Sequence, residues 1–126
     1  MRYPVLFLAA LSALLAVVMG AFGAHALKTV LTVEMLAVYK TAVNYHMWHA
    51  LGLGLIAVFQ QLSGESCYLL WAGRLMFSGI VLFSGSLYLL AILNIPALGM
   101  ITPLGGLAFM AAWGLVLVFA AKESPV

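Results

Sequence analysis

Long stretches without a charged side chain dominate this sequence. Residues 3–27, 41–64 and 75–121 contain no Asp, Glu, Lys or Arg. A helix needs about 20 mostly apolar residues to cross the hydrocarbon core of a bilayer, so the last run is long enough for two such helices. The pattern predicts an integral membrane protein with four membrane-spanning helices.

The composition agrees with this interpretation. Hydrophobic residues make up 67% of the 126 residues and charged residues only 6%, whereas roughly half of an ordinary soluble domain is apolar. The net charge of +2 is too small and dispersed to indicate nucleic-acid binding. A lone cysteine, Cys67, excludes a disulfide framework within one chain. Residues 1–126 are therefore predicted to form a single membrane domain.

Proline, glycine and polar residues divide the apolar runs into helices. Pro4 suits a first helical turn, and Thr102-Pro103 is typical of a helix start. Pro96 and Gly99 separate the last two spans. We expect spans at about 4–25, 41–62, 68–93 and 103–121. Short connections between them predict an all-α, up-down-up-down four-helix bundle.

The stretch of mixed polarity before the second span predicts a further short helix at about 31–40. Thr32 can cap its N-terminus, and Glu34 lies in the first turn, where a negative charge is favourable. Apolar side chains at Val33, Leu36 and Ala37 would share one face. We expect this helix to lie in the membrane interface.

Basic residues are distributed slightly in favour of one side of the membrane. Four spans place Arg2, Arg74 and Lys122 on the side of both termini, and Lys28 and Lys40 on the other. Loops rich in Lys and Arg remain cytoplasmic. Both termini are therefore predicted to be cytoplasmic.

Polar residues within the spans are expected to gather at one depth. Alternating helix direction puts most of them in the half of the bilayer opposite the termini, which is the outer half. The other half is almost wholly apolar apart from Arg74 and Ser78. Ionisable groups in membranes usually face a partner or a cavity. We expect a polar pocket between the second and third spans, and its candidate ligand-binding residues are His25, Tyr45, His49, Ser84, Ser86, Tyr88 and Thr102.

Two histidines with helical spacing allow a metal site as one interpretation. His46 and His49 are three residues apart and can share a helical face, and His25 could supply a third ligand. The alternative is that these imidazoles bridge helices by hydrogen bonds.

Four ordered motifs resemble the small membrane family called domain of unknown function 423, which includes bacterial inner-membrane proteins and eukaryotic transmembrane protein 256. The motifs are GAFGAHAL at 20–27, Tyr45-x-x-x-His49, FSGSLY at 83–88, and TPLGG at 102–106 followed by Trp113. The resemblance implies a four-span, multi-pass protein of the bacterial inner (plasma) membrane and implies no activity. Members of this family often carry Gln where this chain has His46, so Tyr45 and His49 receive more weight than His46.

Several functions are compatible with these features. Small size and many small-residue helix faces favour an accessory or structural subunit that self-associates or joins a larger membrane complex. The alternatives are a small-solute carrier or channel, and a histidine-based metal or cofactor site. An enzyme is not expected, because the chain has no Asp to complete a Ser-His-Asp set. No cofactor is assigned.

Overall fold

The computed structural model describes residues 1–122, and these residues form helices and no strands. Helix α1, Pro4–Phe22, continues into the π-helical segment η1, Gly23–Leu27. Helix α2 covers Val33–Ser63. One long rod is formed by α3 (Cys67–Gly79), the π-helical segment η2 (Ile80–Ser84) and α4 (Gly85–Leu93), and the short 3₁₀ segment η3 (Pro96–Met100) leads to α5 (Thr102–Lys122).

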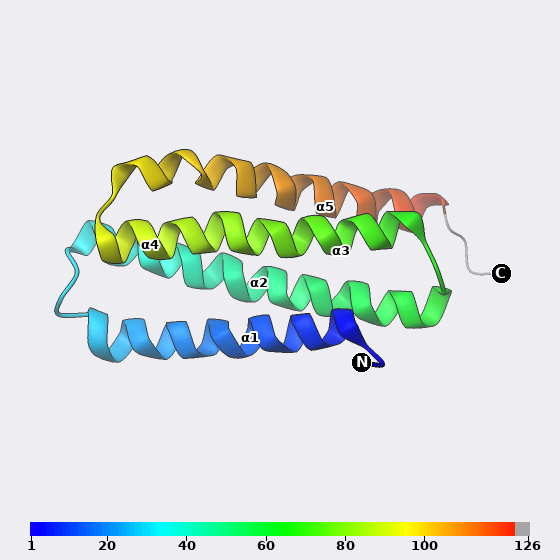
Figure 1. Ribbon diagram of the computed structural model, residues 1–126, viewed down its shortest axis with the longest axis horizontal. Helices are drawn as coiled ribbons and strands as arrows, with labels where there is room; N and C mark the ends of the chain where they lie inside the picture. The colour runs from blue at the N-terminus through cyan, green and yellow to red at the C-terminus, as the bar shows by residue number, and fades with distance from the viewer. Residues whose placement is uncertain (123–126) are drawn as a thin grey trace.

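The helical rods lie side by side and alternate in direction (Figure 1). The N-terminus and the end of α5 at Lys122 lie at one end of the molecule, which we call the terminal end. The turns that follow η1 and α4 lie at the other end, which we call the distal end. The predicted all-α up-down arrangement is confirmed.

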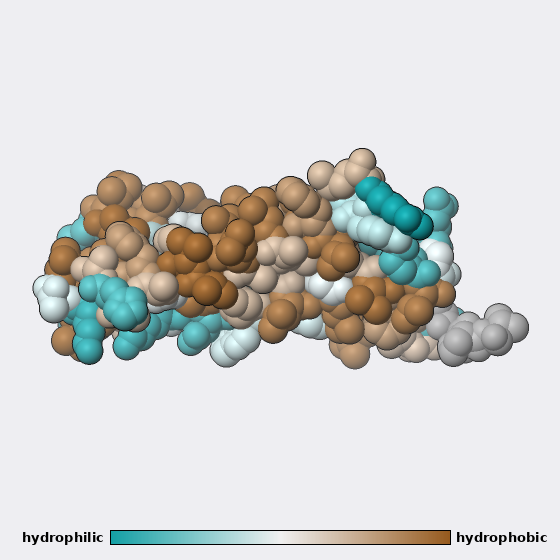
Figure 2. Space-filling view, turned by 90° about the horizontal axis from the view of Figure 1, so that it is seen from below, coloured by the Kyte–Doolittle hydropathy of each residue, from teal (hydrophilic) through white to brown (hydrophobic). Residues whose placement is uncertain are grey.

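Three of the rods are long and apolar enough to cross a membrane: Pro4–Leu27, Cys67–Leu93 and Pro96–Lys122. Helix α2 is not among them, because it carries Asn44, His46 and His49 and is less apolar. The rods Pro4–Leu27 and Cys67–Leu93 nevertheless run in the same direction, so α2 is the segment that returns the chain from the distal to the terminal end (Figure 1). Apolar residues cover the middle of the visible surface, and hydrophilic residues gather toward the two ends (Figure 2).

The expected interfacial helix at 31–40 is not a separate element. Thr32 caps a helix as predicted, with its Oγ1 accepting a hydrogen bond from the backbone N–H of Met35 at 3.1 Å. That helix then continues without interruption to Ser63. No proline or glycine lies between Val33 and Gly52 to break it. The residues assigned to the interfacial helix are instead the first two turns of α2.

Small residues let α1 pack closely on α2. Ala9, Ser12 and Ala16 form the buried stripe of α1. A Cβ added at Gly54 of α2 would lie 3.9 Å from the Cβ of Ala9, which is an ordinary van der Waals distance. These small residues lie three and four positions apart on one face of α1, which allows close helix approach in membranes.

Glycines also set the position of α5. A Cβ at Gly105 would lie 2.3 Å from the backbone nitrogen of Phe83, so α5 rests directly on the backbone of η2. One turn further along α5, Phe109 fills the space above Gly79 of α3, where a Cβ would lie 2.4 Å from the ring. The close approach of α5 to η2 therefore depends on the missing side chain of Gly105.

Candidate functional site

A polar cluster at the distal end joins α2, η2, α4 and α5. Its members are His46, Ser84, Ser86, Tyr88 and Thr102. The His46 Nδ1 and the Tyr88 hydroxyl are 2.9 Å apart, and both side chains are buried. This hydrogen bond connects side chains that are far apart in the sequence, and it ties α2 to α4.

The serines and the threonine complete the links between helices. The Ser84 hydroxyl donates to the backbone carbonyl of Ala42 at 2.8 Å, which is a second bond to α2. The hydroxyls of Ser86 and Thr102 are 2.6 Å apart and join α4 to α5. The Ser86 hydroxyl also donates to the backbone carbonyl of Phe83, in the same rod, at 3.0 Å.

His49 lies one helical turn after His46 on α2 but contacts a different helix. Its Nδ1 is 2.7 Å from the backbone carbonyl of Tyr45, and because a carbonyl can only accept, Nδ1 carries the proton. The imidazole ring stacks on Phe109 of α5 with a centroid separation of 3.5 Å and an interplanar angle of 12°. The ring is also nearly parallel to that of Tyr45, at 5.8 Å, and the Tyr45 ring is itself 6.3 Å from that of Phe109. His49 therefore takes part in an aromatic stack between α2 and α5.

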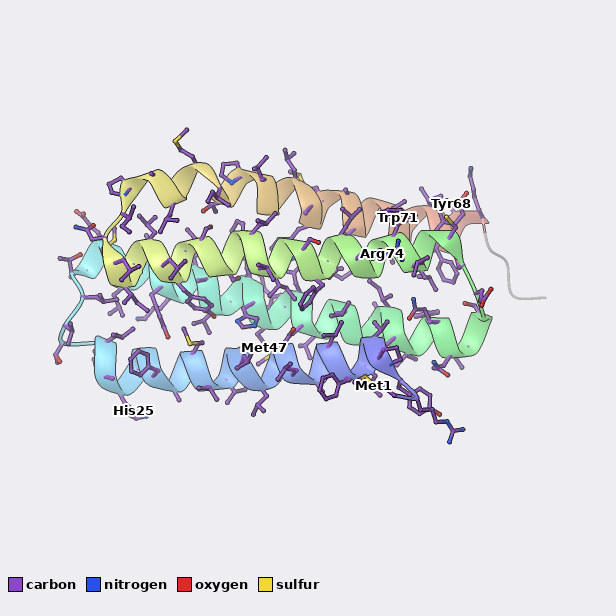
Figure 3. All side chains as sticks on the ribbon, in the orientation of Figure 1. Met1, His25, Met47, Tyr68, Trp71 and Arg74 are labelled. Atoms are coloured by element: carbon purple, nitrogen blue, oxygen red, sulfur yellow. The ribbon has the colours of Figure 1, made fainter. Side chains whose placement is uncertain are left out.

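His25 lies apart from the other predicted site residues. It is exposed on η1, and its side chain points away from the other helices (Figure 3). His46 contacts α4 and His49 contacts α5, so the three imidazoles face three directions. Within residues 1–122 no group of three His, Cys, Asp or Glu side chains is placed to hold a metal ion. The predicted contribution of His25 to a shared pocket is not seen.

The structure brings together most of the remaining predicted residues, but in two groups. Ser84 and Tyr88 bond to α2, and Ser86 contacts Thr102 of α5. Tyr45 and His49 form the separate stack with Phe109. His46 received the least weight from the sequence, yet it makes the one hydrogen bond between side chains of α2 and α4 in the described part of the chain.

Sequence reasoning missed Tyr39. Its side chain is 1% exposed, and its hydroxyl donates to the backbone carbonyl of Met19 in α1. Its ring lies 5.3 Å from that of Tyr88. Tyr39 and His46 are seven residues apart, two helical turns, so both face the same side of α2. In one continuous helix that spacing predicts that Tyr39 and His46 share a face, whereas a separate interfacial helix at 31–40 does not predict it.

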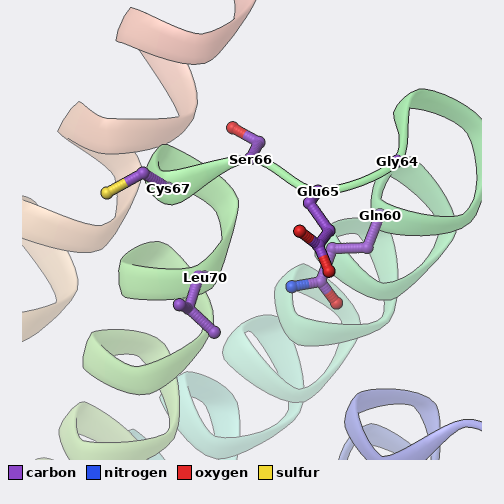
Figure 4. A pocket seen from close by; sticks show the side chains of 6 residues that line it. All are labelled: Gln60, Gly64, Glu65, Ser66, Cys67 and Leu70. Atoms are coloured by element: carbon purple, nitrogen blue, oxygen red, sulfur yellow. The ribbon is translucent and has the colours of Figure 1, made fainter.

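Two cavities open at the terminal end, away from the polar cluster. One has a volume of about 640 Å³ and is lined by Gln60, Gly64, Glu65, Ser66, Cys67 and Leu70 (Figure 4). The other, of about 590 Å³, lies between the start of α1 and the last turns of α2 and includes Tyr3, Ala57 and Gln61. The sequence had indicated only a polar turn here.

We expect Tyr88→Phe to destabilise the protein by about 1–3 kcal/mol, because it leaves the buried His46 Nδ1 without its partner. His46→Leu should cost a similar amount. The double variant should cost less than the sum, with a coupling energy of about 1 kcal/mol. Unfolding in mixed detergent micelles, followed by circular dichroism, measures all four free energies. Additive effects would show that the two groups are not bonded in the membrane protein.

Comparison with known proteins places the chain in one family of membrane proteins. Residues 19–106 match the family model described as "Protein of unknown function (DUF423)". The chain is similar to the UPF0382 membrane protein YwdK of Bacillus subtilis, with 52% identity over 93% of this chain and 95% of that protein. It is also similar to the UPF0382 membrane protein SH2409 of Staphylococcus haemolyticus, with 45% identity over 93% and 94% of the two chains. No solved structure matches.

Proposed function

Since the chain belongs to the DUF423 (UPF0382) family of small multi-pass membrane proteins, we propose that it is a structural subunit of a membrane assembly. The observation that carries this proposal is the state of its interior polar groups. Each member of the polar cluster has its hydrogen-bond partner inside the chain. No fully buried side-chain nitrogen or oxygen within residues 1–122 lacks a partner.

Groups already paired within the chain serve to hold helices together. A carrier must bind its solute through polar groups that the solute can reach, and must offer a path across the bilayer. Here an apolar cluster that includes Leu53, Ile56, Met76 and Phe119 fills the region between the polar cluster and the terminal end. This arrangement favours a structural role over a solute carrier or an enzyme.

Basic residues at the terminal end support a cytoplasmic location for this end of the molecule. Arg2 lies over the ring of Tyr3 at 5.3 Å, and Arg74 lies over the ring of Trp71 at 4.9 Å. Trp71, Arg74 and Tyr68 are close together on α3 (Figure 3). Such cation–aromatic pairs suit the headgroup layer, and the excess of basic residues favours the cytoplasmic side. The polar cluster then belongs to the outer half of the membrane.

Labelling of Cys67 tests this orientation. Cys67 is exposed at the terminal end, so we expect a membrane-impermeant maleimide to label it only after cells are permeabilised. The matched variant carries Thr29→Cys and Cys67→Ser, with its thiol in the exposed turn at the distal end. It should be labelled in intact cells. The reverse pattern would invert the orientation and place the polar cluster in the inner half.

Purification from native membranes in a mild detergent tests the structural role. We expect the protein in a stoichiometric assembly, either of its own copies or with another membrane protein, detected by native mass spectrometry. A monomer without partners, together with solute uptake that is lost on deletion and in a Tyr88→Phe variant of normal abundance, would contradict the proposal and favour the carrier.

A further inference from the structure

Helix α2 leaves one face uncovered along its whole length. The exposed residues on this face, which we call the α2 seam, follow one another in alternating steps of four and three. This is the spacing of the apolar positions in a heptad repeat, by which two helices pack along a shared line. The seam consists of Ala37, Thr41, Asn44, Trp48, Leu51, Leu55, Val58 and Leu62.

The neighbouring helices flank the seam without covering it. Helix α1 packs extensively on α2, and it does so through the face that includes Gly54. Helix α5 reaches α2 on the other side, where Trp113 lies against Gly52. Between them Leu51 remains 63% exposed and Leu62 76% exposed. A second helix can therefore approach α2 along this line.

Asn44 distinguishes the seam from a surface that merely faces lipid. Its side chain is exposed, and the described residues provide no hydrogen bond for its amide. With α2 centred in a hydrocarbon core of about 30 Å, a helix of this length places Asn44 about 9 Å below the membrane surface. Lipid chains offer neither donors nor acceptors, so an unpaired amide at this depth is costly.

A second copy of the chain supplies the matching group. An amide has both a donor and an acceptor, so two Asn44 side chains related by a two-fold axis can satisfy each other reciprocally. Two copies inserted in the same orientation bring their α2 helices together in parallel, with each seam position opposite itself. A single Asn among mostly apolar contact positions can also fix the register of paired helices.

We propose that the protein forms a symmetric dimer in the membrane along the α2 seam, with the Asn44 amides paired at the two-fold axis. This inference rests on the proposed structural role and names a second copy of the chain as the partner. Leu51, Leu55, Val58 and Leu62 form the apolar part of the contact toward the terminal end. Trp48 is held against Tyr45, with ring centroids 5.0 Å apart, and flanks the amide pair.

Cysteine cross-linking in native membranes tests the position of the contact. In a Cys67→Ser background, Leu51→Cys and Leu55→Cys should form disulfide-linked dimers on mild oxidation. Leu14→Cys on α1 and Leu117→Cys on α5 are controls outside the seam, 60% and 72% exposed against 63% for Leu51 and 44% for Leu55, and should remain monomeric. Cross-links at Leu14 or Leu117 but not in the seam would overturn the proposed surface and leave the structural role standing.

Substitution of Asn44 tests the amide pair. Asn44→Leu keeps the side chain at a similar size and should raise the dimer dissociation constant roughly three- to tenfold, measured by energy transfer between labelled copies diluted in lipid bilayers. Ser63→Ala is the control on the same helix but outside the seam, because the Ser63 hydroxyl already donates to the Phe59 carbonyl; it should leave the constant unchanged. An unchanged constant for Asn44→Leu would overturn the amide pair. Copies that remain monomeric while a different protein copurifies would overturn the dimer but retain the structural role.

Discussion

Gly105→Ala is expected to destabilise the protein by about 2–3 kcal/mol, because the added methyl group has no space. Its Cβ would lie 2.3 Å from the backbone nitrogen and 2.7 Å from the Cα of Phe83. A flexible side chain could move aside at little cost, but the backbone of η2 is held by its own helix. Helix α5 must therefore shift outward. Unfolding in mixed micelles, compared with the unsubstituted protein, measures the loss.

The shift should also disturb the polar cluster. Thr102 lies one turn before Gly105 on α5, so outward movement lengthens its 2.6 Å contact with Ser86. Gly114→Ala is the matched control on the same helix, since a Cβ added there would have no neighbouring atom within 4 Å outside its own helix backbone. It should be neutral, or more stable by up to about 1 kcal/mol through helix propensity. Equal effects at the two glycines would show that α5 does not rest on η2.

Most of the fold could be predicted from the sequence because the residues that begin or cap each helix act locally. Pro4 begins α1, Thr32 caps α2 and Thr102 begins α5, as each residue type predicts. The error at residues 31–40 arose from treating a change in polarity as a change in structure. Lys40 ends an amphipathic stretch, but a charged residue does not break a helix.

The site was harder to predict than the fold, because it depends on how each helix is rotated about its axis. His46 and His49 are one turn apart on α2, but His46 bonds to Tyr88 of α4 and His49 stacks on Phe109 of α5. Each π-helical turn contains an additional residue and so alters the helical phase. Ser84 closes such a turn. The hydrogen bond between His46 and Tyr88 depends on how α2 and α4 are rotated about their axes and on how closely the helices pack. Neither can be predicted from the sequence of one helix.

Tyr39→Ala is expected to have the largest effect of any substitution considered, about 3–5 kcal/mol, because it empties the interior of the distal end. The Tyr39 ring fills the space beside Gly23 of η1, where a Cβ would lie 2.3 Å from the ring. The same ring packs against Tyr88. Its removal therefore leaves a cavity between α1, α2 and α4. The free energy of unfolding in mixed micelles and hydrogen exchange of residues 19–27 measure the change.

Tyr39→Phe separates the role of the ring from that of the hydroxyl. This variant keeps the packing and loses only the hydrogen bond to the Met19 carbonyl, so it should cost about 1 kcal/mol. Exchange in η1 should rise strongly for Tyr39→Ala and weakly for Tyr39→Phe. If the two variants were equally unstable, the hydroxyl and not the ring would hold α1 to α2. If neither were destabilised, the first two turns of α2 would not be docked on α1 in the membrane, and the interfacial helix expected from the sequence would be the better description of residues 31–40.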